Sequence, residues 1–177
     1  MPDPFGAELI KLLPNLRRFA LSLCGSADVA DDLVQLTCQK ALSNRGSFAA
    51  GTRMDAWLFR ILRNAWIDII RKRKTEGATD AVDTAELVGT DGVAASESRL
   101  ALGETMAAIS RLPEDQREVL VLVCIEELSY KETAAVLDLP IGTVMSRLAR
   151  ARKKLAADLG IDGLPIRSDS VEKREAR

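Results

Sequence analysis

The sequence predicts an all-α protein of two small helical domains joined by a flexible acidic linker. In both halves of the 177-residue chain, apolar residues recur at the spacing of amphipathic helices, and no stretch alternates as a strand does. Over 75–98 the composition changes to small and acidic residues, with six Asp or Glu and no Lys or Arg. Such a segment buries too little apolar surface to fold. The predicted organisation is a helical domain at 9–74, a linker at 75–98, a second helical domain at 99–160 and a polar tail at 161–177.

The first domain is expected to begin with two amphipathic helices. Apolar residues repeat over 9–23, where Pro14 either kinks the helix or occupies the first turn of a helix that begins there. A second helix is predicted over 27–42 from its Asp-rich start. Its outward face carries acidic and amide side chains: Asp31, Asp32 and Gln35. Periodicity favours simple solvation of this face, and docking of a basic partner is the alternative.

A polar, glycine-punctuated loop over 43–53 and a third helix over 54–74 complete the first domain. Phe48 in the loop is either a plug that packs on the helices or an exposed wedge. The apolar stripe of the third helix comprises Met54, Trp57, Leu58, Ile61, Leu62, Ala65 and Ile69. A polar group lies away from this stripe: Arg60, Arg63 and Asn64. The cations at 71–74 complement the helix dipole, whereas the mid-helix group has no such structural reason and indicates nucleic acid.

The second domain is expected to end in a helix-turn-helix motif over 128–155, behind two more helices on either side of Pro113. Ser129 is placed to cap a short supporting helix, with Glu132 in capping-box register. Asp138 tolerates the turn, and Pro140 prevents the supporting helix from continuing. A second helix then starts at Gly142-Thr143.

This second helix has one apolar face and one basic face. Its apolar residues at helical spacing are Val144, Leu148, Ala151 and Leu155. No acidic residue occurs between Leu139 and Ala157, and the opposite face is cationic. It carries Ser146, Arg147, Arg150, Arg152, Lys153 and Lys154. A basic helix face is often only solvated, but together with the supporting helix and tight turn it favours DNA binding.

Composition argues against an enzyme. The formal net charge is −1, so any attraction for nucleic acid must come from local patches. The chain has no histidine, and Cys24, Cys38 and Cys124 lie in apolar segments without a C-x-x-C pair, which predicts small core residues. We expect no catalytic residue, metal, cofactor or small-molecule substrate.

The longest apolar run, 119–125, is too short to cross a bilayer, so a cytoplasmic protein without membrane contact is expected.

Three stretches resemble a known family. They are DDLVQLTCQKAL, SFAAGTRMDAWLFRILRNAWIDIIRKRK and LPEDQREVLVLVCIEELSYKETAAVLDLPIGTVMSRLARARKKL. In this order they are similar to bacterial RNA polymerase sigma factors of the extracytoplasmic-function (ECF) group in the sigma-70 family. The first domain resembles sigma region 2 and the second resembles region 4. Residues 22–35, 48–59 and the LPEDQRE segment are especially similar to the alphaproteobacterial general-stress group.

The resemblance implies a factor that binds core RNA polymerase, directs transcription initiation at promoter DNA and is held by an anti-sigma factor. The polymerase-binding residues would be Asp31, Asp32 and Gln35, which favours docking over solvation for that face. Minus-ten recognition would fall to loop 47–52 and to Arg60, Arg63 and Asn64, with a flipped base held in a pocket. The minus-thirty-five element would be read by Thr143, Met145, Ser146, Arg147 and Arg150.

Two departures from the family pattern and two rival functions accompany this interpretation. Met145 replaces a frequent lysine or arginine, and Asp138 replaces a common turn glycine, which affects the fine sequence preference.

One rival is a sigma-like decoy that binds an anti-sigma factor without reading DNA, for which loss of the last helix's basic residues is expected. The other is a stand-alone helix-turn-helix repressor, which leaves the basic face of the 54–74 helix without a purpose.

Overall fold

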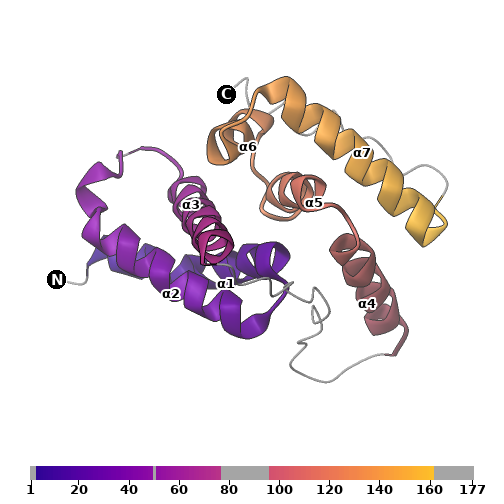
Figure 1. Cartoon of the computed structure of the whole chain (residues 1–177), viewed down its shortest axis with the longest axis horizontal. Helices are drawn as coiled ribbons and strands as arrows, with labels where there is room; N and C mark the ends of the chain where they lie inside the picture. The colour runs from indigo at the N-terminus through magenta and orange to yellow at the C-terminus, as the bar shows by residue number, and fades with distance from the viewer. Residues whose placement is uncertain (1–2, 50, 77–95, 162–177) are drawn as a thin grey trace. The chain divides into compact units, whose positions relative to one another are not determined.

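The computed structural model describes residues 3–49, 51–76 and 96–161, with side chains of the 96–110 helix described from residue 103 onward. Every regular element in these ranges is a helix, which confirms the predicted all-α class. The chain divides into two compact units, Met1–Gly89 and Thr90–Arg177 (Figure 1). Most of the predicted linker and nearly all of the predicted tail lie outside the described residues.

The first unit is a bundle in which each of three long helices packs on the other two. They are α1 (Pro4–Cys24), α2 (Ala27–Ser43) and α3 (Met54–Thr75), with a 3₁₀ turn at Arg45–Ser47 (Figure 1). Asp3 caps α1 by accepting a hydrogen bond from the Phe5 N–H at 3.2 Å. The helix then runs through Pro14 to Cys24, so Pro14 lies in its interior and not in its first turn.

Helix α3 buries more of its surface than a single stripe. Leu58, Leu62 and Ala65 are buried as predicted, but Phe59 and Trp66, which the predicted stripe omitted, are also buried. The Phe59 ring packs edge-on against Phe19 of α1, with 5.2 Å between ring centroids. Because α3 contacts both α1 and α2, two neighbouring stripes of this helix face the core.

The second unit is built around its last helix. Its elements are α4 (Ser96–Ser110), α5 (Glu114–Leu120), a π-helical turn at Val121–Ile125, α6 (Tyr130–Leu137) and α7 (Ile141–Leu159). Helices α4, α5 and α6 all pack on α7. Residues 117–123 are continuously buried, so α5 and the first half of the π-helical turn form the centre of this core.

The cysteines do not all fulfil their predicted core role. Cys24 is buried and Cys38 is half-buried, and this burial raises the pKa of the Cys38 thiol. Cys124 is exposed, so its predicted burial was wrong. It follows the last buried residue of the π-helical turn, Val123, on the side of the turn that faces water. Within the described ranges, no helix is both long enough and apolar enough to span a membrane.

Candidate nucleic-acid interface

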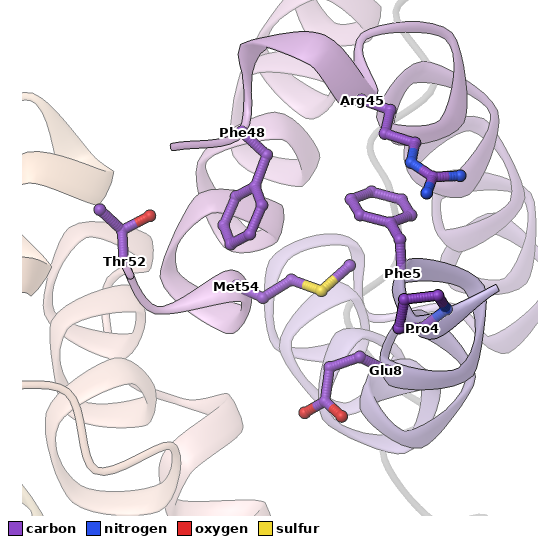
Figure 2. Close-up of a pocket in the computed structure, with 7 residues that line it drawn as sticks. All are labelled: Pro4, Phe5, Glu8, Arg45, Phe48, Thr52 and Met54. Atoms are coloured by element: carbon purple, nitrogen blue, oxygen red, sulfur yellow. The ribbon is translucent and has the colours of Figure 1, made fainter. Parts of the chain in front are cut away.

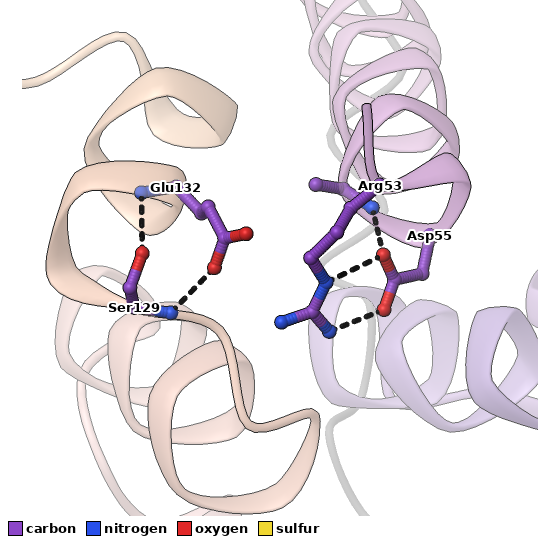
Figure 3. Close-up of polar contacts among 5 residues, drawn as sticks. Arg53, Asp55, Ser129 and Glu132 are labelled. Carbon is purple, nitrogen blue, oxygen red and sulfur yellow. Dashed lines mark hydrogen bonds and ion pairs between the residues drawn. The ribbon is translucent and has the colours of Figure 1, made fainter. Parts of the chain in front are cut away.

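The helix-turn-helix of the second unit is fixed by local contacts. The Ser129 hydroxyl accepts a hydrogen bond from the Glu132 N–H at 3.2 Å, and the Glu132 carboxylate accepts one from the Ser129 N–H at 2.7 Å (Figure 3). The predicted capping box is thereby confirmed. Asp138 adopts the left-handed conformation, with φ 53°, and Pro140 occupies the N-cap position of α7. These residues set where α6 ends and where α7 begins.

Helix α7 turns its apolar face inward and its basic face outward. The four predicted apolar residues, Val144, Leu148, Ala151 and Leu155, are all buried. The residues predicted to contact the minus-thirty-five element therefore lie around the other side of the helix. Arg150 is exposed, Met145 is 51% exposed, and Thr143, Ser146 and Arg147 are half-buried at the edges.

The cations of α7 divide into two groups according to their contacts. Arg147 Nε lies 3.3 Å from Oδ2 of Asp115 on α5, and Lys154 Nζ donates a hydrogen bond to the Arg111 carbonyl at 3.3 Å. Arg152 Nη2 lies 3.6 Å from the Cys124 Sγ. In contrast, Arg150 and Lys153 make no hydrogen bond or ion pair with any residue in the described ranges. These two cations remain available for phosphates or base edges.

A second polar face lies on α3 of the first unit. Arg60 and Asn64 are exposed, and neither side chain is bonded to another residue that the structure describes. Arg63 is half-buried and is held by contacts within the chain. Arg71 and Lys74 continue the same face at helical spacing. The α3 face is therefore a row of one amide and several cations along the helix.

The start of α3 is fixed by an acidic side chain and not by its N-cap residue. The Asp55 carboxylate accepts a hydrogen bond from the Ala56 N–H at 2.8 Å and another from Arg53 Nε at 3.0 Å (Figure 3). A carboxylate in the first turn also complements the helix dipole. Arg53 is consequently held by Asp55 at the base of the segment that joins α2 to α3.

That connecting segment borders a pocket of about 490 Å³. The pocket is lined by Pro4, Phe5, Glu8, Arg45, Phe48, Thr52 and Met54 (Figure 2). Phe48 is half-buried, with its ring centroid 6.2 Å from that of Phe5 and 5.3 Å from that of Trp57. Of the two alternatives for Phe48, the plug is therefore observed. The contribution of Pro4, Phe5 and Glu8 was missed, since no sequence signal links the start of α1 to this segment.

The acidic residues of α2 are exposed, as the helical period predicts. Asp31 is paired with Arg17 of α1, with Oδ1 2.7 Å from Nε and Oδ2 3.4 Å from Nη2. Asp32 and Gln35 have no bonded partner in the described ranges. Among these same residues, no group of three His, Cys, Asp or Glu side chains is placed to hold a metal ion.

Both units match parts of one protein family. Residues 9–76 match sigma-70 region 2, and residues 102–155 match sigma-70, region 4. The ECF RNA polymerase sigma factor EcfG of Rhodopseudomonas palustris is 41% identical to this chain over 163 residues, covering 92% of the chain and 89% of that protein. SigW of Bacillus subtilis, another ECF sigma factor, is 32% identical over 77% of this chain and 79% of its own length.

Solved structures agree with this assignment. The sigma factor RpoE from Bartonella quintana, solved in complex with the anti-sigma factor NepR, is 38% identical, with a TM-score of 0.74 over 90% of this chain and 98% of that chain. The structure of CnrH in complex with the cytosolic domain of CnrY is 31% identical, with a TM-score of 0.63. The chain therefore belongs to the ECF group of the sigma-70 family, whose members direct RNA polymerase to initiate transcription.

Proposed function

We propose that this sigma factor serves a stress response in the cytoplasm and reads promoters with two separate polar faces, one on α7 and one on α3. The observation that carries the proposal is that each unit presents a helix whose apolar face is buried and whose outward face carries basic or amide side chains without a bonded partner among the described residues. The 41% identity to EcfG supports the stress-response assignment. The factor performs no bond chemistry itself.

Helix α7 is assigned to the minus-thirty-five element. Arg150 is the strongest candidate for a bidentate contact to guanine, because it is exposed and has no bonded partner in the part of the chain that the structure describes. Thr143, Met145 and Ser146 lie near the start of the helix, where recognition helices contact base edges. Arg147 is assigned to a phosphate at the edge of the groove, because Asp115 already holds its guanidinium.

Helix α3 and the segment before it are assigned to the opened minus-ten element. Arg60 and Asn64 are available for the strand, and Arg63 completes their face. The pocket at Phe48 and Thr52 adjoins the start of α3 and offers aromatic surface on which an unpaired base can stack. The volume of about 490 Å³ leaves ample room for one base.

Two protein partners are assigned to other surfaces. Asp32 and Gln35, with Asp31 beside them, form an exposed polar face on α2 that suits the polymerase clamp. An anti-sigma factor is the second partner, since RpoE and CnrH were each solved in complex with one. Exposed large apolar residues occur on both units and are available to it: Ile10, Leu42, Ile141 and Met145.

Run-off transcription with core RNA polymerase tests the assignment. Addition of the protein is expected to redirect the polymerase to promoters that carry its two elements, and triple replacement of Asp31, Asp32 and Gln35 by alanine is expected to weaken polymerase binding. Specific operator binding without polymerase would favour the repressor. Anti-sigma binding without any change of start site would favour the decoy.

A further inference from the structure

The first turn of α1 is tied to the segment after α2 by a charged contact between residues far apart in the chain. Arg45 Nη2 lies 2.8 Å from Oδ1 of Asp3, and Arg45 Nη1 donates a hydrogen bond to Oδ2 at 2.9 Å, across a separation of 42 residues. A two-point contact of this kind fixes the plane of the guanidinium as well as its position. Asp3 therefore fixes Arg45, the residue that begins the 3₁₀ turn.

Aromatic contacts make the same connection. The Arg45 guanidinium carbon lies 5.1 Å from the centroid of the Phe5 ring. The Phe5 ring also meets Phe48 and Trp57, each at 6.2 Å between centroids and near edge-to-face geometry. In Figure 2, Phe5 lies between the Arg45 guanidinium and the centre of the pocket, which Phe48 approaches from the other side. One residue of α1 thus touches both Arg45 and Phe48.

Hydrogen bonds within the segment between α2 and α3 do not fix its position against the helices. The Ser47 hydroxyl donates to the Asn44 carbonyl at 2.7 Å, and the Thr52 hydroxyl donates to the Ala49 carbonyl at 2.7 Å. Such bonds close turns but do not place the turns against the bundle. Gly51 has a φ of 88°, in the left-handed region that glycine adopts without steric cost, and it has no side chain that could hold the segment on the bundle. The position of the segment therefore depends on Arg45, which α1 holds through Asp3 and Phe5, and on Phe48, which packs on Phe5 of α1 and on Trp57 of α3.

We infer that Asp3 and Phe5 are positioning residues for promoter opening: they hold Arg45 and Phe48 in the arrangement that receives an unpaired base. The inference rests on the proposed role of the Phe48 pocket in minus-ten recognition. A pre-arranged site avoids the entropy cost of ordering the segment when DNA arrives. Without Asp3 and Phe5, the pocket lacks the Phe5 part of its lining, and the segment between α2 and α3 lacks its contacts with α1.

The test uses holoenzyme assembled from core polymerase and full-length protein. The probe is a promoter fragment with a pre-opened minus-ten region, and the measurement is the ratio of affinities for the preferred base and a substituted base at each unpaired position. Asp3→Asn is expected to lower this ratio by about two- to fivefold, the effect of an exposed ion pair. Phe5→Ala is expected to lower it by about tenfold, because three aromatic or cationic contacts are lost.

The matched control is Asp68→Asn, which removes the same charge from the same unit. Asp68 lies 3.9 Å from Lys40 and does not touch the segment, so this variant should keep the wild-type ratio. Asp3→Glu, which keeps a carboxylate opposite Arg45, is expected to keep a ratio close to that of the wild type. Thermal stability and core-polymerase affinity should be unchanged in Asp3→Asn, which separates positioning from a general loss of folding.

The outcomes distinguish this inference from the function on which it rests. If Phe48→Ala lowers base discrimination but Asp3→Asn and Phe5→Ala do not, the positioning role is wrong and the pocket assignment stands. If Phe48→Ala has no effect either, the pocket assignment itself fails. Equal losses in Asp3→Asn and Asp68→Asn would show a general charge effect and would overturn the inference.

Discussion

Helices α3 and α7 both present cations to solvent, but they differ in how many of these cations are free. On α7, three of the five cations contact their own unit: Arg147, Arg152 and Lys154. On α3, the side chains of Arg60, Arg71 and Lys74 have no bonded partner in the described ranges. A cation count from sequence therefore overstates the number of α7 side chains that are free to bind DNA, although only Arg147 among its three contacting cations is paired with a carboxylate. DNA recognition by α7 therefore depends on few side chains, whereas α3 presents several free cations along one face.

Arg150→Ala is expected to have the largest effect, because Arg150 is an exposed arginine of α7 that has no bonded partner among the residues the structure describes. If Arg150 reads a guanine bidentately, its loss removes about 1–3 kcal/mol of discrimination at one minus-thirty-five position. Reconstituted transcription from promoters substituted at each position measures the change. The control is Arg152→Ala on the same helix, whose guanidinium lies 3.6 Å from Cys124 Sγ. Equal effects of the two variants would mean that α7 contributes only general charge.

Ser129→Ala tests how much the capping box at the start of α6 contributes to the stability of the protein. The variant removes the hydroxyl that accepts the Glu132 N–H, and loss of an N-cap typically costs about 1 kcal/mol. Thermal or urea unfolding measures the loss, and Ser129→Asp, which keeps an acceptor at the cap, should show little change. An unchanged midpoint for Ser129→Ala would mean that tertiary packing alone holds α6 in place.

Arg60→Ala tests whether the polar face of α3 binds DNA phosphates. Loss of one phosphate contact should make the dependence of log affinity on log salt less steep by about 0.7–0.9, which is roughly a four- to fivefold loss at 0.15 M salt. Holoenzyme binding to promoter DNA across a salt series measures the slope. Lys72→Ala is the control, because Lys72 lies off this face and pairs with Glu76 at 3.8 Å. Equal slopes for the two variants would contradict a directed face on α3.

Asp138→Gly is expected to have the smallest effect and to be stabilising. Asp138 occupies the left-handed region at φ 53°, where glycine carries no steric penalty. The gain is expected to be about 0.5 kcal/mol, because the greater freedom of glycine in the unfolded chain offsets part of it. Unfolding of the whole protein measures it. A loss of stability would mean that the Asp138 side chain contributes more than its backbone strain costs.

The same division between local and distant contacts explains which features could be predicted. The capping box at Ser129, the turn at Asp138 and the buried stripe of α7 depend on residues a few positions apart, and all were predicted. The omission of Phe59 and Trp66 came from assuming one buried stripe for a helix that packs on two neighbours. The exposure of Cys124 was missed because a π-helical turn changes the helical period locally.

The amino-acid sequence by itself determined the helical class, the capping box at Ser129, the family and the residue types on each polar face, because these follow from periodicity, from cap chemistry and from motifs along the chain. Only the tertiary structure decided which cations are free, that Phe48 packs inward, and that Asp3 meets Arg45 across 42 residues with Phe5 beside it. Those contacts join residues that no period relates, and they form only when the packing of buried side chains brings distant helices together.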